Sequence, residues 1–330
     1  MSLLPLVDRP LGQDEACAAF GAMLDGRADD EDIARFLLHL SDRGETATEI
    51  AGAAEAMRVR MIPIEAPANA IDVCGTGGDG HHTLNVSTAV ALLVAACGVP
   101  VAKHGNRAAS SKAGAADTLE ALGLDMEAAG RTAEMTLREI GICFLFAQNH
   151  HPAMARIQPI RRSLGKRTIF NLMGPLANPA GVDRQLIGIA RPAYVPIYAE
   201  ALARLGTGHS MIVSGDEGLD ELSLAGGNEV ATIKGGERRM SRIEAGEAGL
   251  SQAPVEAISG GDPAHNAAAL RALLMGEPGA YRDAVLLNAA GALIVAGEAS
   301  SWMEGVEKAR EVIDQGLAKT LLECWIAAAK

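Results

Sequence analysis

Residues 72–117, DVCGTGGDGHHTLNVSTAVALLVAACGVPVAKHGNRAASSKAGAAD, contain the features that decide the fold. A short apolar run, Ile71 to Cys74, leads into this stretch and predicts a buried strand. The pattern then predicts a helix over 88–97 with Ser87 as its N-cap, and a second short strand over 100–102. This succession is typical of an open α/β sheet, in which both strand ends face one crevice.

The segments that follow the two predicted strands are suited to phosphate. Four glycines fall between residues 75 and 80, and the second strand leads into the cationic, hydroxyl-rich segment 103–112. Glycines let backbone N–H groups approach an anion, a helix N-terminus adds partial positive charge, and lysines complete the site. We therefore predict a pocket for a polyphosphate ligand.

The GTGGDG sequence at residues 75–80 also matches the GxGxxG fingerprint of dinucleotide-binding folds. That fingerprint requires a helix that opens at once and an acidic residue about 20 positions further on. Here the predicted helix waits until Ser87, and the second strand ends in Lys103 and His104. Both requirements fail, so phosphate binding is favoured over a nicotinamide or flavin site, with a purely structural glycine turn as the other alternative.

The bulk composition limits the partners. The chain has 330 residues, 48% hydrophobic residues and a net charge of −12, so it can form two domains with a large core but lacks the basic surface that nucleic acid or an anionic membrane requires. The five cysteines show no CxxC or zinc spacing, which predicts buried free thiols in a reducing compartment. No apolar run reaches the roughly 18 residues of a membrane span. We expect a cytoplasmic protein.

The chain divides into an all-helical start and an α/β remainder. Helical spacing predicts helices over 11–25, 30–43 and 46–61, the last opened by a Thr46–Glu49 capping box. We expect a small helical domain, residues 1–68, joined by part of 153–180, and an α/β domain, residues 69–330, with a mostly parallel sheet. Further strands are predicted over 141–147, 185–189, 209–214 and 229–233, and further helices over 153–170, 264–275, 281–296, 302–315 and 318–329.

Five motifs carry a family resemblance. GTGGDG, NVST, KHGNR-x-x-SSK, the block from His151 to Pro179 (HPAM-x6-RRSLGKRTIFNLMGPLANP) and GLDELS at 218–223 occur in this order. Together they resemble the anthranilate phosphoribosyltransferase family, over about residues 12–325. The resemblance implies the nucleoside phosphorylase/phosphoribosyltransferase-like fold, transfer of 5-phosphoribose from phosphoribosyl pyrophosphate to anthranilate in tryptophan biosynthesis, a Mg2+ cofactor, and a homodimer formed through the helical domain.

The resemblance also implies roles for individual residues. Family members often have a serine where Ala115 stands, which removes one expected side-chain contact. The residues that match the family's phosphoribosyl pyrophosphate site are Gly75, Gly78, Asp79, Thr83, Asn85, Val86, Ser87, Thr88, Lys103, His104, Gly105, Asn106, Arg107, Ala108, Ala109, Ser110, Ser111 and Ala115.

Adjacent carboxylates predict a metal. Bare carboxylates beside pyrophosphate would repel it, whereas Mg2+ typically uses one or two carboxylates together with phosphate oxygens. Asp220–Glu221 and the nearby Asp216–Glu217 are rival pairs that the residues alone hardly separate. The resemblance favours Asp220 and Glu221, with Ser87 as a further ligand. Asp79 is expected to bond a sugar hydroxyl or a backbone amide, or simply to form an Asx turn.

The acceptor site is implied by the resemblance alone. Arg161 matches the family arginine that holds the anthranilate carboxylate, for which its fork of donors is suited. From the residues alone, any of five basic residues in 153–170 could take this role. The other residues implied for anthranilate are Gly75, His104, Asn106 and Pro175. The pairs His81–His82 and His150–His151 are interpreted as loop residues.

Two other functions stay open at this point. A pyrimidine nucleoside phosphorylase shares the helical-plus-α/β layout but needs only one phosphate site. A non-enzymatic nucleic-acid-binding relative is opposed by the net charge of −12 and by the Asp220–Glu221 pair. No catalytic triad or reactive cysteine motif is evident, so we expect catalysis by positioning and charge stabilisation, without a covalent nucleophile.

Overall fold

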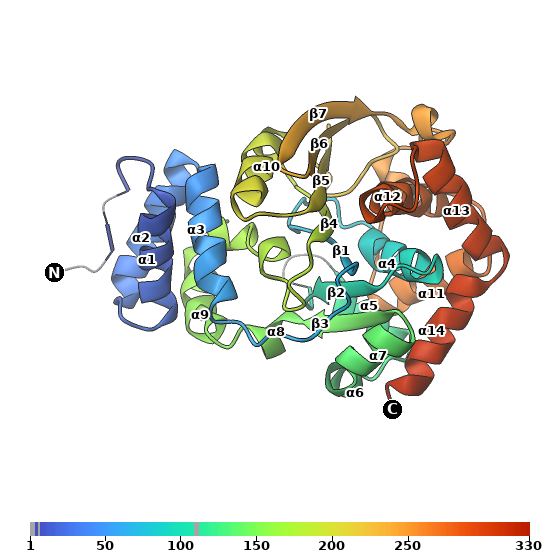
Figure 1. The fold of residues 1–330 in the computed structure, drawn as a ribbon, viewed down its shortest axis with the longest axis horizontal. Coiled ribbons are helices and arrows are strands. Elements are labelled where there is room, and N and C mark those ends of the chain that lie inside the picture. The colour runs from blue at the N-terminus through green and yellow to red at the C-terminus, as the bar shows by residue number, and fades with distance from the viewer. Residues whose placement is uncertain (1–3, 6, 109–111) are drawn as a thin grey trace.

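A computed structural model describes residues 4–5, 7–108 and 112–330 of the chain. A helical bundle at the N-terminus lies beside a larger part in which helices surround a sheet (Figure 1). The strands of the described residues are β1 (Ile71–Gly75), β2 (Val101–Gly105), β3 (Ile142–Phe146), β4 (Arg184–Gly188), β5 (His209–Gly215), β6 (Asn228–Lys234) and β7 (Glu237–Ile243).

These strands form one sheet in the order β3-β2-β1-β4-β5-β6-β7. The first five strands in this order, from β3 to β5, pair with their neighbours in parallel. Strand β6 pairs antiparallel with both β5 and β7. Parallel strands are covered on both faces and read as continuous apolar runs, which explains why the sequence predicted most of them. It did not predict β7, which lies at the sheet edge and is exposed at six of its seven residues.

Helices cover both faces of the sheet. The α-helices are α1 (Gln13–Leu24), α2 (Asp30–Arg43), α3 (Ala47–Arg58), α4 (Val86–Ala96), α5 (Ala115–Ala121), α6 (Met126–Arg131), α7 (Ala133–Glu139), α8 (Ala147–His150), α9 (Met154–Leu164), α10 (Val195–Arg204), α11 (Pro263–Leu274), α12 (Ala280–Ala296), α13 (Trp302–Asp314) and α14 (Leu317–Ala328). Short 3-10 helices are η1 (Ile169–Asn171), η2 (Pro175–Ala177), η3 (Pro192–Tyr194), η4 (Ala245–Ala248) and η5 (Val255–Ile258).

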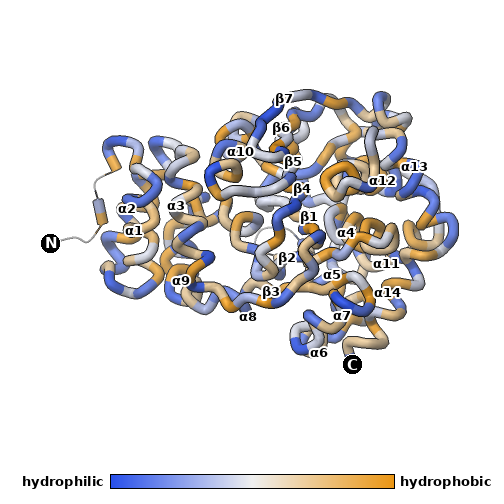
Figure 2. The backbone as a smooth tube through the Cα atoms, in the orientation of Figure 1, coloured by the Kyte–Doolittle hydropathy of each residue, from blue (hydrophilic) through white to orange (hydrophobic). Residues whose placement is uncertain are grey.

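The core of the α/β part has two layers. On β4, Leu186 packs into the layer under α4 and α12, and Ile187 packs into the layer under α10. This alternation follows from the period of two along a strand. Helices α4 and α12 are apolar on nearly every side (Figure 2), because they are enclosed between the sheet and the outer helices α13 and α14.

The helical part is tied together by one buried carboxylate. The Glu49 side chain accepts hydrogen bonds from the N–H groups of Thr46 (2.9 Å) and Leu11 (2.8 Å), and it pairs with Arg43. The predicted Thr46–Glu49 capping box is thus confirmed, and the same side chain also joins the start of α1 to the end of α2. Helix α9 packs against α1 and α2, far from it in sequence.

Three predicted elements are wrong at their ends. Strand β2 runs to Gly105 instead of ending at 102, because it pairs with β3 over its whole length. The helix predicted over 153–170 ends at Leu164, because Gly165 takes the left-handed conformation (φ +58°) that commonly closes a helix. Helix α4 begins at Val86, so its N-cap is Asn85 and not Ser87.

The structure also bears on the expected burial of the cysteines and on the expected absence of a membrane span. All five cysteines are unpaired; Cys74 and Cys143 are buried, whereas Cys324 is exposed, so the expectation of burial is wrong for that residue. Cys324 lies on the outer surface of α14, where helical periodicity turns one side to solvent. Among the described residues, no helix has the length and apolarity that crossing a bilayer demands.

The contact of α1 with α3 yields a stability prediction. A Cβ added at Gly52 in α3 would lie 2.3 Å from the Gln13 carbonyl oxygen of α1, whereas a Cβ at Gly130 in α6 would meet nothing closer than 3.5 Å. We expect Gly52→Ala to lower the free energy of unfolding by about 1–3 kcal/mol through overpacking. The control Gly130→Ala should raise it by about 0.4–1 kcal/mol. Calorimetric melting of both variants measures this, and equal melting temperatures would contradict the packing described.

Candidate active site

The sheet topology places the predicted loops at one edge. Strands β1 and β4 are neighbours and end in register at Gly75 and Gly188, but their connections lead to opposite sides of the strand order. Such a switch point forms a crevice outside the carboxyl ends of the strands. The glycine loop (residues 76–80) follows β1, the segment 106–114 follows β2, and the acidic loop (residues 216–227) follows β5. The expectation that the ends of the first two predicted strands lie at one edge of the sheet is confirmed, because β1 and β2 are parallel neighbours.

Asp220 and Glu221, in the acidic loop, contact the glycine loop and the start of α4. The Asp220 carboxylate accepts a hydrogen bond from the Gly77 N–H at 2.6 Å, and the Glu221 carboxylate accepts one from the Ser87 N–H at 3.2 Å. Burial raises the pKa of Asp220 to about 7, helped by the charge of Asp79. Burial raises the pKa of Glu221 to about 8, helped by the charge of Asp220. Among the described residues, neither carboxylate has an ion-pair partner.

The rival acidic pair is used differently. Asp216 forms a salt bridge with Arg242 at 2.6 Å, and Glu217 accepts a hydrogen bond from the Ser223 hydroxyl. Both carboxylates are exposed. They stabilise the acidic loop and its neighbouring strands, and so the geometry separates the two pairs that the residues alone did not.

Two buried asparagines hold the acidic loop, and the sequence analysis missed both. The Asn288 side chain of α12 accepts from the Leu222 N–H and donates to the Leu222 carbonyl oxygen, both at 2.8 Å. In the same way, the Asn228 side chain of β6 accepts from the Ser223 N–H at 2.7 Å and donates to the Ser223 carbonyl oxygen at 3.0 Å. These paired bonds fix the backbone directly after Glu221. An asparagine within an apolar helix such as α12 is the only sequence signal for this role.

Lys103 is buried within β2 beneath the crevice. Its side chain donates to the Val73 carbonyl oxygen at 2.8 Å and to the Ser87 hydroxyl at 3.2 Å. Asp72, which is fully buried, accepts from the His104 N–H (3.1 Å) and from Asn178 (2.8 Å). Burial raises the pKa of Asp72 and the charge of Lys103 opposes this rise. A carboxylate inside an apolar strand was the signal for Asp72, which the sequence analysis did not use.

The start of α4 differs from expectation. The Asn85 side chain is held within the protein, because it accepts from Thr118 (2.5 Å) and Asn266 (2.8 Å) and donates to the Ala113 carbonyl oxygen (3.3 Å). Thr88 is buried, with a hydroxyl that has no partner in the described residues. Two other predicted site residues lie near this helix start. Thr83 forms an isolated antiparallel β-bridge with Ser259, and Val86 is buried.

The loop after β2 is only partly described. Arg107 donates to Asp117 (2.9 Å) and Glu120 (2.8 Å), and these bonds raise its pKa. Its charge is thus neutralised within the loop. The Ala108 N–H also donates to Asp117, and Ala115 is the first residue of α5. Gly105 ends β2, and the Asn106 side chain accepts from the Arg107 N–H. The predicted contacts of Ala109, Ser110 and Ser111 lie outside the described residues.

Asp79 forms the Asx turn that was one of its expected roles. Its carboxylate accepts from the His81 N–H at 3.1 Å, two residues further on. This bond orients the carboxylate within the glycine loop, where its charge helps to raise the pKa of Asp220.

The predicted acceptor residues come from different elements: His104 from β2, Pro175 from η2 and Arg161 from α9. The His104 imidazole bonds the Gly174 carbonyl oxygen at 3.0 Å, next to the buried Pro175, and its ring lies 5.2 Å from that of His151. Each ring has a buried Nε2 atom that finds no hydrogen-bond partner in the described parts of the chain. The interpretation of His151 as a loop residue is confirmed, although its side chain is buried beside His104, whereas His150 is the last residue of helix α8.

Arg161 lies on α9, in the helical part. Its guanidinium stands 5.7 Å from the centre of the Phe170 ring, and burial lowers its pKa. No described residue forms an ion pair with it, and no hydrogen bond joins it to the strand-end loops. The structure therefore leaves Arg161 as an uncompensated cation, which is the state that an incoming carboxylate requires.

The donor set suits magnesium in combination with a substrate. Within the described part of the chain, no cluster of three or more His, Cys, Asp or Glu side chains could hold a metal. Asp220, Glu221 and the Ser87 hydroxyl supply oxygen only, which is the ligand type that Mg2+ prefers. Since Mg2+ is commonly bound by one or two carboxylates plus phosphate oxygens, the residues present fit this ion if the substrate completes its coordination.

Comparison with known proteins identifies the family to which this two-part chain belongs. Residues 67–319 match the family model described as "Glycosyl transferase family, a/b domain", and residues 6–61 match "Glycosyl transferase family, helical bundle domain". The chain therefore belongs to the glycosyl transferases with this two-part organisation. It is 73% identical over 328 residues to the anthranilate phosphoribosyltransferase of Novosphingobium aromaticivorans, covering 99% of both chains. It is 70% identical to that of Erythrobacter litoralis, covering 100% of both.

Solved structures agree with these sequence relatives. The anthranilate phosphoribosyltransferase of Thermus thermophilus superposes with a TM-score of 0.92 at 45% identity, covering 98% of this chain and 97% of that one. That of Saccharomyces cerevisiae, in complex with PRPP and Mg, has a TM-score of 0.88 at 28% identity, with 97% and 93% covered. The chain belongs to the anthranilate phosphoribosyltransferase family, and the resemblance seen in the motifs is confirmed.

The raised pKa values of Asp220 and Glu221 make stability depend on pH. In the unfolded chain both carboxyls return to their ordinary pKa values near 4, so the folded metal-free protein binds more protons between about pH 4 and 8. The contribution of this pair to stability is therefore greatest below pH 4 and is lost as the pH rises through 7 to 8.

The double variant Asp220→Asn, Glu221→Gln should remove this loss. We expect its melting temperature, measured with chelator, to exceed that of the unmodified protein at pH 8.5 by at least about 2 °C. The difference should shrink toward pH 4. Parallel pH profiles for the two proteins would show that the pair does not carry raised pKa values.

Proposed function

We propose that this protein transfers the 5-phosphoribosyl group from phosphoribosyl pyrophosphate to the amine of anthranilate, giving N-(5-phosphoribosyl)anthranilate and pyrophosphate in tryptophan biosynthesis. The observation that supports it most directly is the position of two carboxylates without an ion-pair partner among the described residues: Asp220 contacts the glycine loop, and Glu221 contacts the first turn of α4. The S. cerevisiae relative with PRPP and Mg, and another with 4-fluoroanthranilate, support the choice of substrates. Mg2+ is the proposed cofactor.

The reaction breaks the bond from the anomeric carbon to pyrophosphate and forms a bond from that carbon to the anthranilate nitrogen, which then loses a proton. The sugar passes through an oxocarbenium-like state, so no covalent nucleophile is required. Bound Mg2+ would neutralise charge on the leaving pyrophosphate, held by Asp220, Glu221 and Ser87. The amides of the glycine loop and the buried cation of Lys103 add to this stabilisation.

The proposed acceptor site consists of one arginine for the carboxylate and two ring-containing side chains beside the aromatic ring. Arg161 binds the anthranilate carboxylate, while His104 and Pro175 line the aromatic ring. Burial lowers the pKa of His104 to about 3, and the neighbouring His151 adds to this, so its imidazole is neutral at pH 7. A neutral histidine neither repels the cationic sugar of the transition state nor competes with Arg161 for the carboxylate. The aromatic amine is itself neutral at pH 7 and needs no general base.

The remaining predicted site residues and partners are part of this proposal. The phosphate-site residues named from the motifs remain part of the proposed site, except that Ala115 lacks a polar side chain for phosphate and the Asn85 side chain is occupied by protein groups. We further propose that residues 1–68 with α9 form the helical domain, that two copies associate through it, and that residues 69–330 form the α/β domain. Val59, at the end of α3, is 81% exposed and supports such a contact. The unpaired cysteines support a cytoplasmic location.

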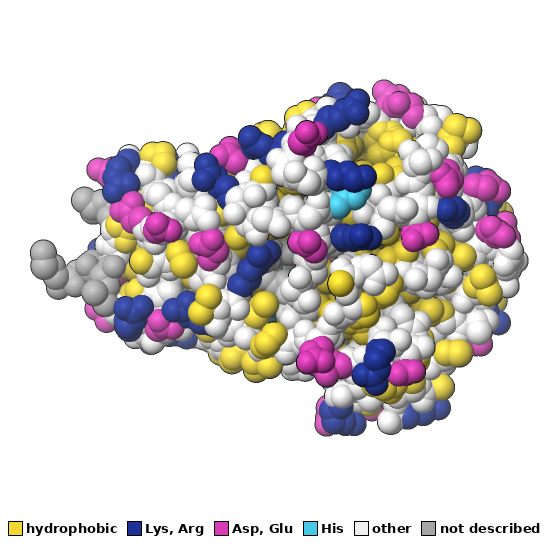
Figure 3. All heavy atoms as spheres, viewed as in Figure 1, with side chains coloured by type: hydrophobic (Ala, Val, Ile, Leu, Met, Phe, Trp, Pro, Cys, Tyr) yellow, Lys and Arg dark blue, Asp and Glu magenta, His cyan; other side chains and the backbone are white. Residues whose placement is uncertain are grey.

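A nucleic-acid-binding function has less support. On the face shown in Figure 3, basic and acidic side chains are interspersed, with no continuous basic stripe. Together with the net charge of −12, this distribution lacks the electrostatic surface that phosphate backbones require.

Pyrophosphate release tests the function. With anthranilate, phosphoribosyl pyrophosphate and Mg2+, one pyrophosphate should appear for each anthranilate consumed, and a chelator should abolish the reaction. Coupled pyrophosphate detection and anthranilate fluorescence measure the two quantities. Phosphorolysis of thymidine without transfer to anthranilate would instead identify a nucleoside phosphorylase.

Arg161→Ala should raise the KM for anthranilate by at least about tenfold, because a charge-assisted hydrogen bond contributes about 1.5–3 kcal/mol. The KM for phosphoribosyl pyrophosphate should change less than about twofold. Arg162→Ala is the matched control, since Arg162 is exposed and adjacent on α9. Steady-state kinetics with each substrate varied in turn supply both values, and loss of both affinities together would contradict the role of Arg161.

A further inference from the structure

We propose that Arg167 is a positioning residue for the glycine loop: it binds the carbonyl oxygens of Gly77 and Gly78 and thereby turns the N–H groups of Gly78 and Asp79 toward the diphosphate of the substrate. This inference rests on the proposed function and adds a residue that neither the motifs nor the family resemblance assigned to the site.

The contacts are direct. The Arg167 guanidinium donates from Nη1 to the Gly78 carbonyl oxygen at 2.6 Å and to the Gly77 carbonyl oxygen at 3.2 Å. The Gly77 N–H donates to Asp220 at 2.6 Å. Both glycines have φ +72°, a conformation that other residues rarely take. The loop is thus held at Gly77 by a cation on one side and a carboxylate on the other.

Peptide geometry converts this contact into an orientation. The C=O of Gly77 shares a peptide plane with the N–H of Gly78, and the C=O of Gly78 shares one with the N–H of Asp79. In a trans peptide these two groups point in opposite directions, and no cis peptide occurs in the described residues. Since both carbonyl groups point to Arg167, both N–H groups point away from it. Two successive N–H groups presented together are a typical anion site.

Within the described residues these two N–H groups have no acceptor, and neither has the N–H of Gly80, in contrast to the amides on either side of this run. The N–H of Thr76 donates to Gly188, that of Gly77 to Asp220, and that of His81 to Asp79. Gly78 is exposed and Asp79 partly buried. Among the described residues, the loop therefore keeps three successive donors unpaired, and Arg167 orients the first two of them toward the place where a diphosphate would bind.

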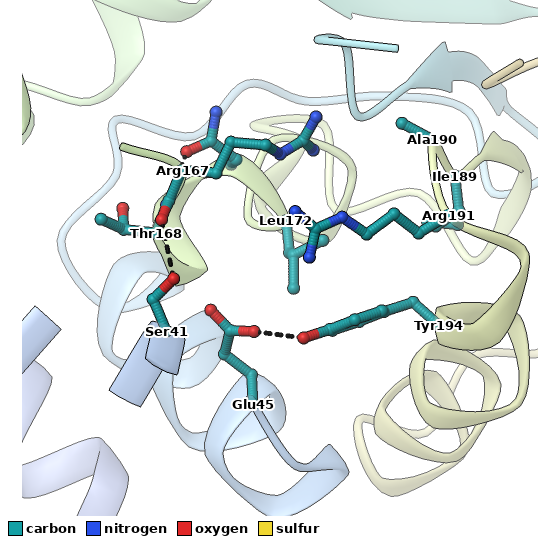
Figure 4. Close-up of a pocket in the computed structure, with 10 residues that line it drawn as sticks. Ser41, Glu45, Arg167, Thr168, Leu172, Ile189, Ala190, Arg191 and Tyr194 are labelled. Carbon is teal, nitrogen blue, oxygen red and sulfur yellow. Dashed lines mark hydrogen bonds between the residues drawn. The ribbon is translucent and has the colours of Figure 1, made fainter. Parts of the chain in front are cut away.

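Arg167 is itself fixed by the helical part. Its carbonyl oxygen accepts from the Ser41 hydroxyl of α2 at 2.9 Å, and the preceding Lys166 pairs with Asp42. Figure 4 shows this contact in a pocket where Arg167 and Arg191 extend toward each other, opposite the Glu45–Tyr194 hydrogen bond. No carboxylate pairs with the Arg167 guanidinium in the described residues, so its charge also favours an anion near the loop.

The test uses Arg167→Met and Arg167→Lys, with Arg162→Met as a control for loss of a nearby charge. We expect Arg167→Met to raise the KM for phosphoribosyl pyrophosphate at least tenfold, to lower kcat, and to change the KM for anthranilate less than twofold. Lysine keeps the charge but cannot hold two carbonyl groups in the same geometry, so it should recover less than half of the loss on a logarithmic scale.

Three results would overturn the proposal: kinetics of Arg167→Met equal to those of Arg162→Met, full recovery by lysine, or a fall in melting temperature that accounts for the whole loss of activity. Absence of pyrophosphate release by the unmodified protein would instead overturn the proposed function, so the two failures are distinguishable.

A double-mutant cycle isolates the contact. A Cβ at Gly78 would lie 2.7 Å from Arg167 Nη1, whereas a Cβ at Gly80 would meet nothing within 4 Å, although both residues have positive φ. We expect Gly78→Ala to weaken substrate binding much less in the Arg167→Met background than in the unmodified protein. Gly80→Ala should have the same effect in both backgrounds. Additivity of the Gly78 and Arg167 substitutions would overturn the proposal.

Discussion

The candidate site depends on two adjacent carboxylates, Asp220 and Glu221, that have no ion-pair partner among the described residues. Burial raises the pKa of both Asp220 and Glu221, and a neighbouring negative charge adds to each rise, that of Asp79 for Asp220 and that of Asp220 for Glu221. The protein tolerates this arrangement because backbone amides bind each carboxylate and because Asn288 fixes the residue that follows them. Under the proposed function, this pair binds a divalent cation together with a diphosphorylated sugar, and that binding would offset the cost of holding two carboxylates in a partly buried site.

Much of the fold was predictable because buried strands and enclosed helices have strong patterns. The apolar runs of β1, β3, β4 and β5 identified the parallel sheet, and the parallel sheet in turn placed the loops at one edge. The ends of elements were less predictable. Polar Lys103 and His104 extend β2, since their side chains are buried through bonds to the backbone, and Gly165 stops α9 inside a sequence that otherwise suits a helix.

The candidate site was predicted unevenly for a physical reason. Glycine runs and adjacent carboxylates are visible in one sequence, and both were found. Contacts between distant segments are not visible: Asn85 has its side chain occupied by three protein groups, and Arg107 has its charge neutralised by Asp117 and Glu120. Arg167, placed in a helix by its spacing, instead bridges the helical part and the glycine loop. Which partner a polar side chain has is decided by the tertiary fold.

The central claim is that the crevice binds a diphosphorylated sugar only together with a divalent cation. Calorimetric titration of phosphoribosyl pyrophosphate into the protein, in Mg2+ and then in excess chelator, tests it most directly. The account predicts one molecule bound per chain in Mg2+ and at least about a hundredfold weaker binding in chelator, since bare carboxylates repel the diphosphate. Equal affinity under the two conditions, or no binding in Mg2+, would contradict it.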